Sequence, residues 1–248
     1  MSLVGFDGAA GTGKTTRLVS TVRAHLTEHP LGEEQRVLAL TKMHGSRRRM
    51  LAKLSGRAGL GVPVDCMTID SFAWRMVRRW RSLLRARGVT MPQEVDWALV
   101  TAAAGELLTI GWVARWVTTL HPVVVVDELQ DCRDGELHIL QGLEPHCAMF
   151  VAADEFQDLN GTGQDTVDWA RAVGTIATLD FNHRTGDRRL LEAAAALRAG
   201  GSMALGTEWT GIPVGAGPGS ARVDGSTAGL GAPRRQLDPR PLPAARPR

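Results

Sequence analysis

The residues with the clearest chemical meaning form a glycine-rich loop near the N-terminus. Residues 8–15 read Gly-Ala-Ala-Gly-Thr-Gly-Lys-Thr and match the pattern G-x-x-x-x-G-K-[ST] without a mismatch. In such a loop the glycines turn backbone N–H groups toward a β-phosphate, Lys14 supplies positive charge to the β- and γ-phosphates, and the Thr15 hydroxyl coordinates Mg²⁺. The residues expected to line this phosphate site are Gly8, Ala9, Ala10, Gly11, Thr12, Gly13, Lys14, Thr15 and Thr16. The alternative is a glycine-rich turn without a ligand, and the flanking strand and helix argue against it.

A second group of chemically capable residues follows a run of four valines, about 110 residues further along the chain. These valines, at 123–126, lead directly into Asp127 and Glu128. The run predicts a buried strand, and ligands bind outside the C-terminal ends of strands in open α/β sheets. There Asp127 would hold Mg²⁺, directly or through water, and Glu128 would polarise an attacking water. Without the loop at 8–15, a strand that ends in a solvated acidic turn would explain the pair equally well.

Alternating apolar strands and helices are expected to bring these two groups together. The predicted strands cover 2–7, 36–41, 64–68, 123–126, 148–153 and 175–181. The predicted helices cover 15–26, 46–55, 71–87, 94–108, 112–120, 136–143, 166–173 and 187–197. Continuous apolar strands that alternate with helices are typical of a mostly parallel sheet covered on both faces. The expected fold class is therefore α/β, as a three-layer P-loop domain.

The composition changes near residue 199, and this change predicts the domain organisation. Residues 200–248 contain seven of the 12 prolines and ten of the 28 glycines, with few large apolar residues. Such a segment buries too little surface to offset the entropy of ordering, so we expect a folded domain over 1–199 and a disordered tail. The tail also accounts for the net charge of +3, because residues 1–199 hold 23 basic and 23 acidic side chains. The charge is therefore no evidence of a nucleic-acid surface on the folded domain.

Further compositional signals concern the cellular setting. No apolar run is longer than a strand, which predicts no membrane span, and the N-terminus lacks the pattern of a secretory signal. The three cysteines, Cys66, Cys132 and Cys147, form no C-x-x-C pair and are predicted to be reduced thiols. We therefore expect a cytoplasmic protein that does not bind a membrane.

The residues after the acidic pair indicate a particular class of P-loop protein. The stretch Asp127-Glu128-Leu129-Gln130-Asp131 resembles the D-E-x-Q-D motif of superfamily 1 DNA helicases of the UvrD/Rep type. Weaker matches in that family's order lie at 38–41 (with Arg48 and Met50 behind it), 68–72, 153–157 and 182–185. The resemblance covers about residues 2–198. It implies the first RecA-like domain of such a helicase, with ATP and Mg²⁺ as cofactors.

The resemblance implies roles for several further side chains. Gln157 would sense the γ-phosphate, Gln130 would connect the catalytic acids to it, and Arg184 would stabilise charge in the transition state. Each also has a plainer interpretation, since Gln157 could cap a turn and Arg184 could lie at the surface. His183 stands where the family usually has a tyrosine that stacks on the base. Imidazole stacks less well, which weakens the implied preference for adenine.

A nucleic-acid surface is implied in the same way. The residues that would contact DNA are Thr41, Lys42, Thr68 and Ser71. Lys42 replaces a phenylalanine that is common at this position and stacks on DNA. Two arginine-rich segments, 42–57 and 75–87, could hold a single-stranded backbone or could be solvated helix faces. For the second segment we favour the solvated face, with Trp74 and Trp80 as packing residues.

The family has two RecA-like domains with ATP between them, and this sequence carries motifs of the first alone. The helical insertion at about 73–121 is also short for the family. Because unwinding requires one domain to move against the other, we expect an Mg-ATP-binding and hydrolysing domain that does not unwind by itself. Its expected partners are single-stranded DNA and a protein that supplies the second domain. The alternatives are a degenerate module that binds nucleotide, DNA or a partner without catalysis and, disfavoured by Gln130, a P-loop kinase.

Overall fold

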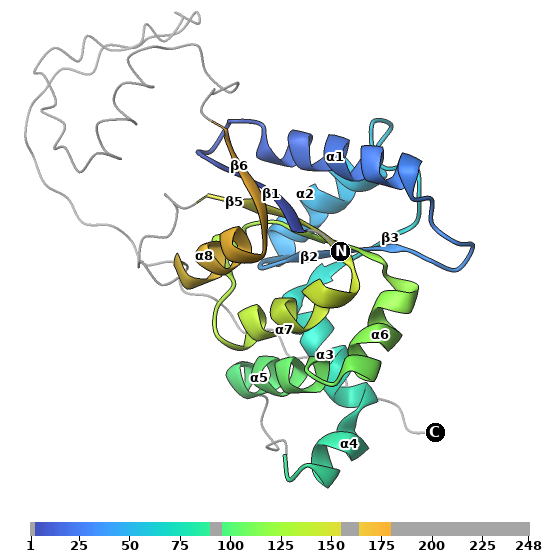
Figure 1. Ribbon diagram of the computed structural model, residues 1–248, viewed down its shortest axis with the longest axis vertical. Coiled ribbons are helices and arrows are strands. Elements are labelled where there is room, and N and C mark those ends of the chain that lie inside the picture. The colour runs from blue at the N-terminus through green and yellow to red at the C-terminus, as the bar shows by residue number, and fades with distance from the viewer. Residues whose placement is uncertain (1–2, 90–95, 155–163, 180–248) are drawn as a thin grey trace, which may run out of the picture. The chain divides into compact units, whose positions relative to one another are not determined.

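Six parallel strands form one sheet in the computed structural model, which describes residues 3–89, 96–154 and 164–179 (Figure 1). The strands are β1 (Leu3–Gly8), β2 (Val37–Thr41), β3 (Val64–Thr68), β4 (Val123–Val126), β5 (Ala148–Ala153) and β6 (Gly174–Leu179). Their order across the sheet is β3-β2-β4-β5-β1-β6, and every neighbouring pair is parallel. Strand β5 therefore separates the strand that carries the glycine-rich loop from the strand that carries the acids.

The central strands are apolar on both faces, which is why helices can cover both. Every residue of β2 and β4 is buried. In β2, Val37 and Ala39 belong to one core cluster, whereas Leu38 and Leu40 belong to the other. Because successive side chains of a strand point to opposite faces, one strand contributes to two core layers.

The helices form two unequal groups on the two faces. Helices α1 (Lys14–Glu28) and α2 (His44–Ser55) share a core cluster with one face of the sheet. The helices on the other face are α3 (Ile69–Arg79), α4 (Arg81–Ala86), α5 (Trp97–Leu108), α6 (Gly111–Leu120), α7 (Gly135–Leu143) and α8 (Gln164–Val173). Two 3₁₀ helices, η1 (Leu129–Asp131) and η2 (Glu144–His146), flank α7. The predicted three-layer α/β fold with a parallel sheet is confirmed.

The long helix expected over 71–87 is the main error in the predicted elements. It begins earlier, because the Thr68 hydroxyl caps α3 by accepting from the Ser71 N–H at 3.2 Å. It is also interrupted at Trp80, which leaves the helical conformation between α3 and α4. The Trp80 ring packs edge-on against Trp112 and Trp116 of α6, with centroids 5.1 and 5.6 Å away. Trp74 and Trp80 are packing residues, as predicted.

Helices α5 and α6 are apolar and follow one another closely in the sequence. No single helix in the described part of the chain is long and apolar enough to cross a membrane. Together the two helices reach the required length and composition, but they are bent by 95° relative to one another. The α5 helix begins at Trp97, where the Asp96 carboxylate accepts from the backbone N–H groups of Ala98 and Leu99 at 3.0 and 3.2 Å.

Several predictions fall on residues that the structure does not describe. They are the end of the last strand at 180–181, the helix at 187–197, the boundary at 199 and the tail at 200–248. The division into a domain and a tail therefore stays a prediction.

Candidate phosphate-binding site

The glycine-rich loop turns sharply between β1 and α1, and its glycines make that turn sterically possible. Gly13 precedes α1 with a φ of 84°, in the left-handed region that strains residues with a Cβ atom. A Cβ atom on Gly8 would lie 2.5 Å from the Leu179 carbonyl oxygen of β6. Within the loop, the backbone N–H and the hydroxyl of Thr12 both donate to the Ala9 carbonyl, at 3.2 and 2.8 Å. The hydroxyl of Thr12 therefore stabilises the loop itself.

Lys14 lies between its own loop and the end of β5. Its Nζ donates to the carbonyl oxygens of Gly8 and Ala9, the latter at 3.1 Å. It also forms an ion pair with the Asp154 carboxylate at 3.1 Å, and both side chains are almost buried. This contact arises because β5 lies between β1 and β4, so that the residue after β5 faces the loop. Sequence reasoning placed Asp154 in a weak motif without any reason to expect a contact with Lys14.

The two acids follow β4 into the same cavity as the loop. Asp127 continues the strand's hydrogen bonding, with its N–H donating to the Leu40 carbonyl at 3.2 Å. Glu128 then has a φ of 58°, an uncommon left-handed conformation for a residue with a side chain. The cavity has a volume of about 530 Å³. It is lined by Ala9, Ala10, Gly11, Gly13, Lys14, Thr15, Thr16, Arg49, Lys53, Asp127 and Glu128.

Gln130 connects the acidic pair to the neighbouring strand. Its amide nitrogen donates to a Glu128 carboxylate oxygen at 2.9 Å, and its amide oxygen accepts from the Asp154 N–H at 2.8 Å. Gln130 is almost fully buried, so both bonds are shielded from water. Gln130 thus connects Glu128 to Asp154, the residue that follows β5. Gln157 itself lies outside the described residues.

The surroundings of Asp127 change its pKa. Burial, together with the adjacent Glu128 carboxylate, raises the pKa of Asp127 to about 6, against the opposing charges of Lys53 and Lys14. A cation bound at Asp127 would stabilise the ionised form and reverse this shift. In the free protein, ionisation of Asp127 is therefore unfavourable, and a bound cation would make it favourable.

Two cations of α2 were not predicted to belong to this site. Arg49 and Lys53 are four residues apart, so they share one face of the helix, and both line the cavity opposite the loop. The sequence assigned them to a basic segment that would hold nucleic acid or face solvent. The helical spacing of the two cations was the available signal. Which face of α2 points toward the loop could not be known without the sheet order.

The residues expected to contact DNA lie at the ends of β2 and β3, which pair with Thr41 opposite Thr68. The Thr68 hydroxyl lies 2.7 Å from that of Ser71, in the cap of α3. The Thr41 hydroxyl donates to the Met43 carbonyl at 3.3 Å. Lys42 forms an ion pair with the buried Glu136 of α7. The charge of Lys42 is thus already compensated within the fold.

Two other predicted site residues, His183 and Arg184, lie outside the described residues. Among the residues that the structure describes, no group of three or more His, Cys, Asp or Glu side chains could hold a metal ion by itself. Thr15 and Asp127 nevertheless line one cavity and offer oxygen ligands. Mg²⁺ is usually held by one or two protein oxygens together with substrate phosphates and water. The donor set therefore fits Mg²⁺ that arrives with a phosphate ligand.

Comparison with known sequences gives one short match. The chain matches no family model. It is 38% identical over 71 residues to one of the subunits of an ATP-dependent helicase/deoxyribonuclease from Exiguobacterium sibiricum. The match covers 29% of this chain and 6% of that protein, so this chain spans a small part of the relative's length.

Comparison with solved structures gives distant likenesses. Domain III of the replication initiation protein DnaA from Thermotoga maritima aligns with a TM-score of 0.36 and 12% identity, over 81% of this chain and 63% of that one. AMPPCP-bound DnaA from Aquifex aeolicus aligns with a TM-score of 0.32 and 14% identity, over 77% of this chain and 54% of that one. At these TM-scores the likenesses carry no argument about function.

Proposed function

We propose that this chain binds Mg-ATP in the cavity beside the glycine-rich loop and hydrolyses it, as an ATPase domain of the UvrD/Rep helicase type. One observation carries the proposal: Asp127 and Glu128 line the same cavity as Lys14 and Thr15, although about 110 residues separate them in the sequence. A glycine-rich loop alone would explain binding of an anion. A loop faced by two carboxylates also offers a metal ligand and a base, which hydrolysis of a phosphoanhydride requires.

Phosphate binding is supported by positive groups on both sides of the cavity. On the loop side, α1 begins at Lys14, so its N-terminal backbone N–H groups and dipole favour an anion there. On the opposite side, Arg49 and Lys53 add two side-chain charges. The nucleotide phosphates would replace the carbonyl oxygens of Gly8 and Ala9 as acceptors for the Lys14 ammonium group.

The proposal of hydrolysis is supported by the hydrogen bond that orients the Glu128 carboxylate. Gln130 donates to its carboxylate, and the Asp154 N–H fixes Gln130 in turn. An oriented carboxylate at this position would accept a proton from the attacking water. Thr15 and Asp127 would hold Mg²⁺, which neutralises charge on the phosphate oxygens. Gln157 and Arg184 are proposed to complete the site at the γ-phosphate, in keeping with the resemblance.

The helicase part of the proposal rests on the order of the sequence motifs and on the 71-residue match. We propose that single-stranded DNA crosses the C-terminal ends of β2 and β3 near Thr41, Thr68 and Ser71. We expect Lys42 to contribute little to DNA binding, because its charge is already paired with Glu136. Unwinding would require a second RecA-like domain, which a partner protein could supply. Without such a domain, the P-loop domain would hydrolyse ATP slowly and would not unwind DNA.

Steady-state phosphate release, measured with and without single-stranded DNA, tests the proposal. Turnover should require Mg²⁺, and Glu128→Gln should lower the rate by about a hundredfold, because general base catalysis contributes on the order of 10²–10⁴. Glu106→Gln, which removes an exposed acid of α5 outside the cavity, is the matched control and should leave the rate unchanged.

The same measurements distinguish the non-enzymatic alternative. If ATP binds but phosphate release stays at background for the wild type and for Glu128→Gln, the chain is a nucleotide-binding module without catalysis. If ATP does not bind at all, the proposal is wrong in both forms.

A further inference from the structure

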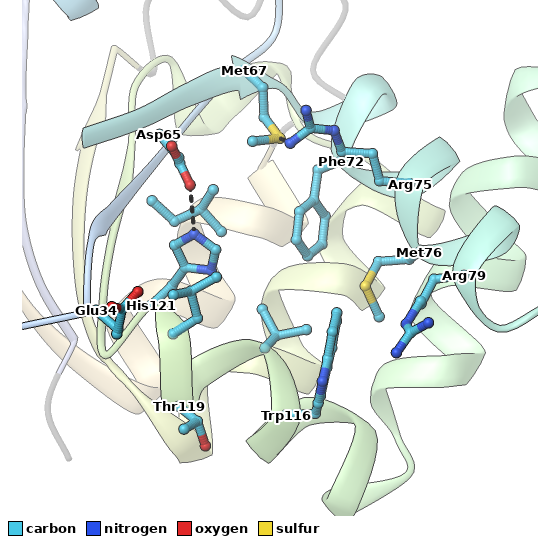
Figure 2. Close-up of a pocket in the computed structure, with 13 residues that line it drawn as sticks. Glu34, Asp65, Met67, Phe72, Arg75, Met76, Arg79, Trp116, Thr119 and His121 are labelled. Atoms are coloured by element: carbon cyan, nitrogen blue, oxygen red, sulfur yellow. Dashed lines mark hydrogen bonds and ion pairs between the residues drawn. The ribbon is translucent and has the colours of Figure 1, made fainter. Parts of the chain in front are cut away.

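A second cavity lies at the edge of the sheet, away from the phosphate site. It occupies about 600 Å³ between β3, α3 and α6 (Figure 2). It is lined by Asp65 near the start of β3, by Met67 near the end of β3 and by His121 just before β4, so it extends along the edge strand. The phosphate cavity lies at the C-terminal ends of β1 and β4. The two cavities share no lining residue.

The body of this cavity is apolar. Phe72 and Met76 of α3, Met67 of β3 and Trp116 of α6 line it, and in Figure 2 the Phe72 and Trp116 rings border the same space. Thioether side chains adapt their shape to a ligand, and aromatic rings offer faces and edges for stacking. A volume of a few hundred Å³ with mostly apolar walls is typical of sites for small organic ligands.

One wall of the cavity carries two arginines, Arg75 and Arg79, which are one helical turn apart on α3. Arg75 donates to the Met67 sulfur at 3.8 Å, and the Arg79 guanidinium lies 5.5 Å from the centroid of the Trp116 ring. Among the described residues, neither arginine has an ion pair with an acid. Their positive charge is therefore available to a ligand.

The opposite wall carries acids, but they do not oppose an anion at the arginines. Asp65 accepts hydrogen bonds from Arg36 at 2.9 Å and from His121 at 3.1 Å. Burial alone would raise the pKa of Asp65, and these two partners outweigh it and hold the pKa below its usual value. Its charge is thus matched by Arg36. Glu34 is exposed and lies across the cavity from Arg75 and Arg79 (Figure 2).

We propose that this cavity binds a small organic anion, namely a planar apolar ring system that carries a carboxylate or sulfonate. The ring would lie among Phe72, Met76 and Trp116, and the acidic group would bind Arg75 and Arg79. A neutral ring would fill the apolar body but leave both guanidinium groups without a partner. A larger polyanion would reach the arginines but could not enter the cavity. The site is independent of the P-loop.

The test uses two fluorescent probes that differ in charge. Anilinonaphthalene sulfonate has the proposed chemistry, and N-phenyl-1-naphthylamine is its neutral counterpart. We expect the sulfonate to bind the full chain saturably with one site. Arg75→Met and Arg79→Met should each weaken the sulfonate by about threefold, because both arginines are exposed to solvent, and leave the neutral probe unchanged. Arg115→Met is the matched control, because Arg115 adjoins Trp116 without lining the cavity.

A second pair of variants locates the ring. Trp116→Ala should weaken both probes, whereas Trp97→Ala should weaken neither, because Trp97 is equally exposed but lies outside the cavity. Circular dichroism and a cooperative thermal transition confirm that each variant is folded. The proposal is wrong if Arg115→Met weakens the sulfonate as much as Arg75→Met and Arg79→Met do, or if Trp116→Ala leaves both affinities unchanged. Binding at many sites without saturation would also overturn it.

Discussion

The phosphate cavity and the apolar cavity differ in what their walls are made of. The first lies at the C-terminal ends of central strands and is lined by backbone and short polar side chains of the loop, with charged residues opposite. The second lies beside the edge strand β3 and is lined by large side chains of α3 and α6. The first depends on backbone conformation, and the second depends on side-chain bulk. Substitutions should therefore separate the two cavities cleanly.

The largest effect is expected from a change in loop backbone. Gly13→Val places a β-branched side chain at a φ of 84°, which costs about 2–3 kcal/mol or distorts the loop. The affinity for ATP should fall by about a hundredfold. Anilinonaphthalene sulfonate should bind as it does to the wild type. Fluorescence titrations of both ligands test this separation, and equal losses for both would show that the two cavities are coupled.

More of the phosphate cavity than of the apolar cavity could be predicted from the sequence. The loop needs glycines and a lysine at fixed positions, and the strand before Asp127 needs four apolar residues, so both were predicted. The Lys14–Asp154 pair was not, because it depends on β5 lying between β1 and β4. Strand order depends on how helices pack across the whole sheet, and local sequence does not encode it.

The sequence contains weaker signals of the apolar cavity. The break at Trp80 was missed because tertiary packing on α6 overrides the helical pattern of 71–87. The sequence predicts that Arg75 and Arg79 belong to a solvated helix face, and both side chains are exposed, as predicted. One helical turn separates these two residues, but only the packing of α3 against β3 places them beside a cavity.

The next largest effect concerns Lys42, whose charge stabilises the fold and lies in neither cavity. Lys42→Met removes the partner of the buried Glu136 carboxylate. The free energy of unfolding should fall by about 2 kcal/mol, because an unpaired buried charge is costly and Lys42 is partly exposed. Urea denaturation measures this change. The double variant with Glu136→Gln should recover at least about half of the loss, and a single variant as stable as the wild type would contradict a structural role.

The next effect concerns pH at the phosphate cavity. With a pKa of about 6, Asp127 is mostly ionised at pH 7 and mostly protonated at pH 5. Because Mg²⁺ binds the ionised form, the Mg²⁺-dependent affinity for ATP should fall about tenfold between these values. The folding stability of the free protein should change in the opposite direction. Because the pKa of Asp127 is raised in the folded state, protonation of Asp127 increases the free energy of unfolding as the pH falls from 6 toward 4.

Calorimetric titrations of ATP with Mg²⁺ at pH 7 and pH 5 measure the pH effect. Asp127→Asn is the control, because it should bind weakly and with the same affinity at both values. A wild-type affinity that does not change with pH would place the titrating carboxyl elsewhere.

The smallest effect is expected from the helix α2. Arg49→Met and Lys53→Met should each weaken ATP by about threefold, because both side chains are exposed to solvent and screened. Arg48→Met, on the same helix but outside the cavity, should have no effect. Titrations at low and high salt would sharpen the result, since the difference between Lys53→Met and the wild type should shrink as salt rises. A loss for Arg48→Met as large as for Arg49→Met would show a general effect of charge.

The most direct test of the central claim is calorimetric titration of Mg-ATP into the full chain and into Lys14→Ala, with Arg48→Ala as the control for loss of one positive charge. We predict one site per chain in the wild type and in Arg48→Ala, and a loss of at least about thirtyfold in affinity for Lys14→Ala, because a charge-assisted contact to phosphate is removed. Equal binding by wild type and Lys14→Ala, or no binding by the wild type, would contradict the assignment of the loop at 8–15 as a nucleotide site.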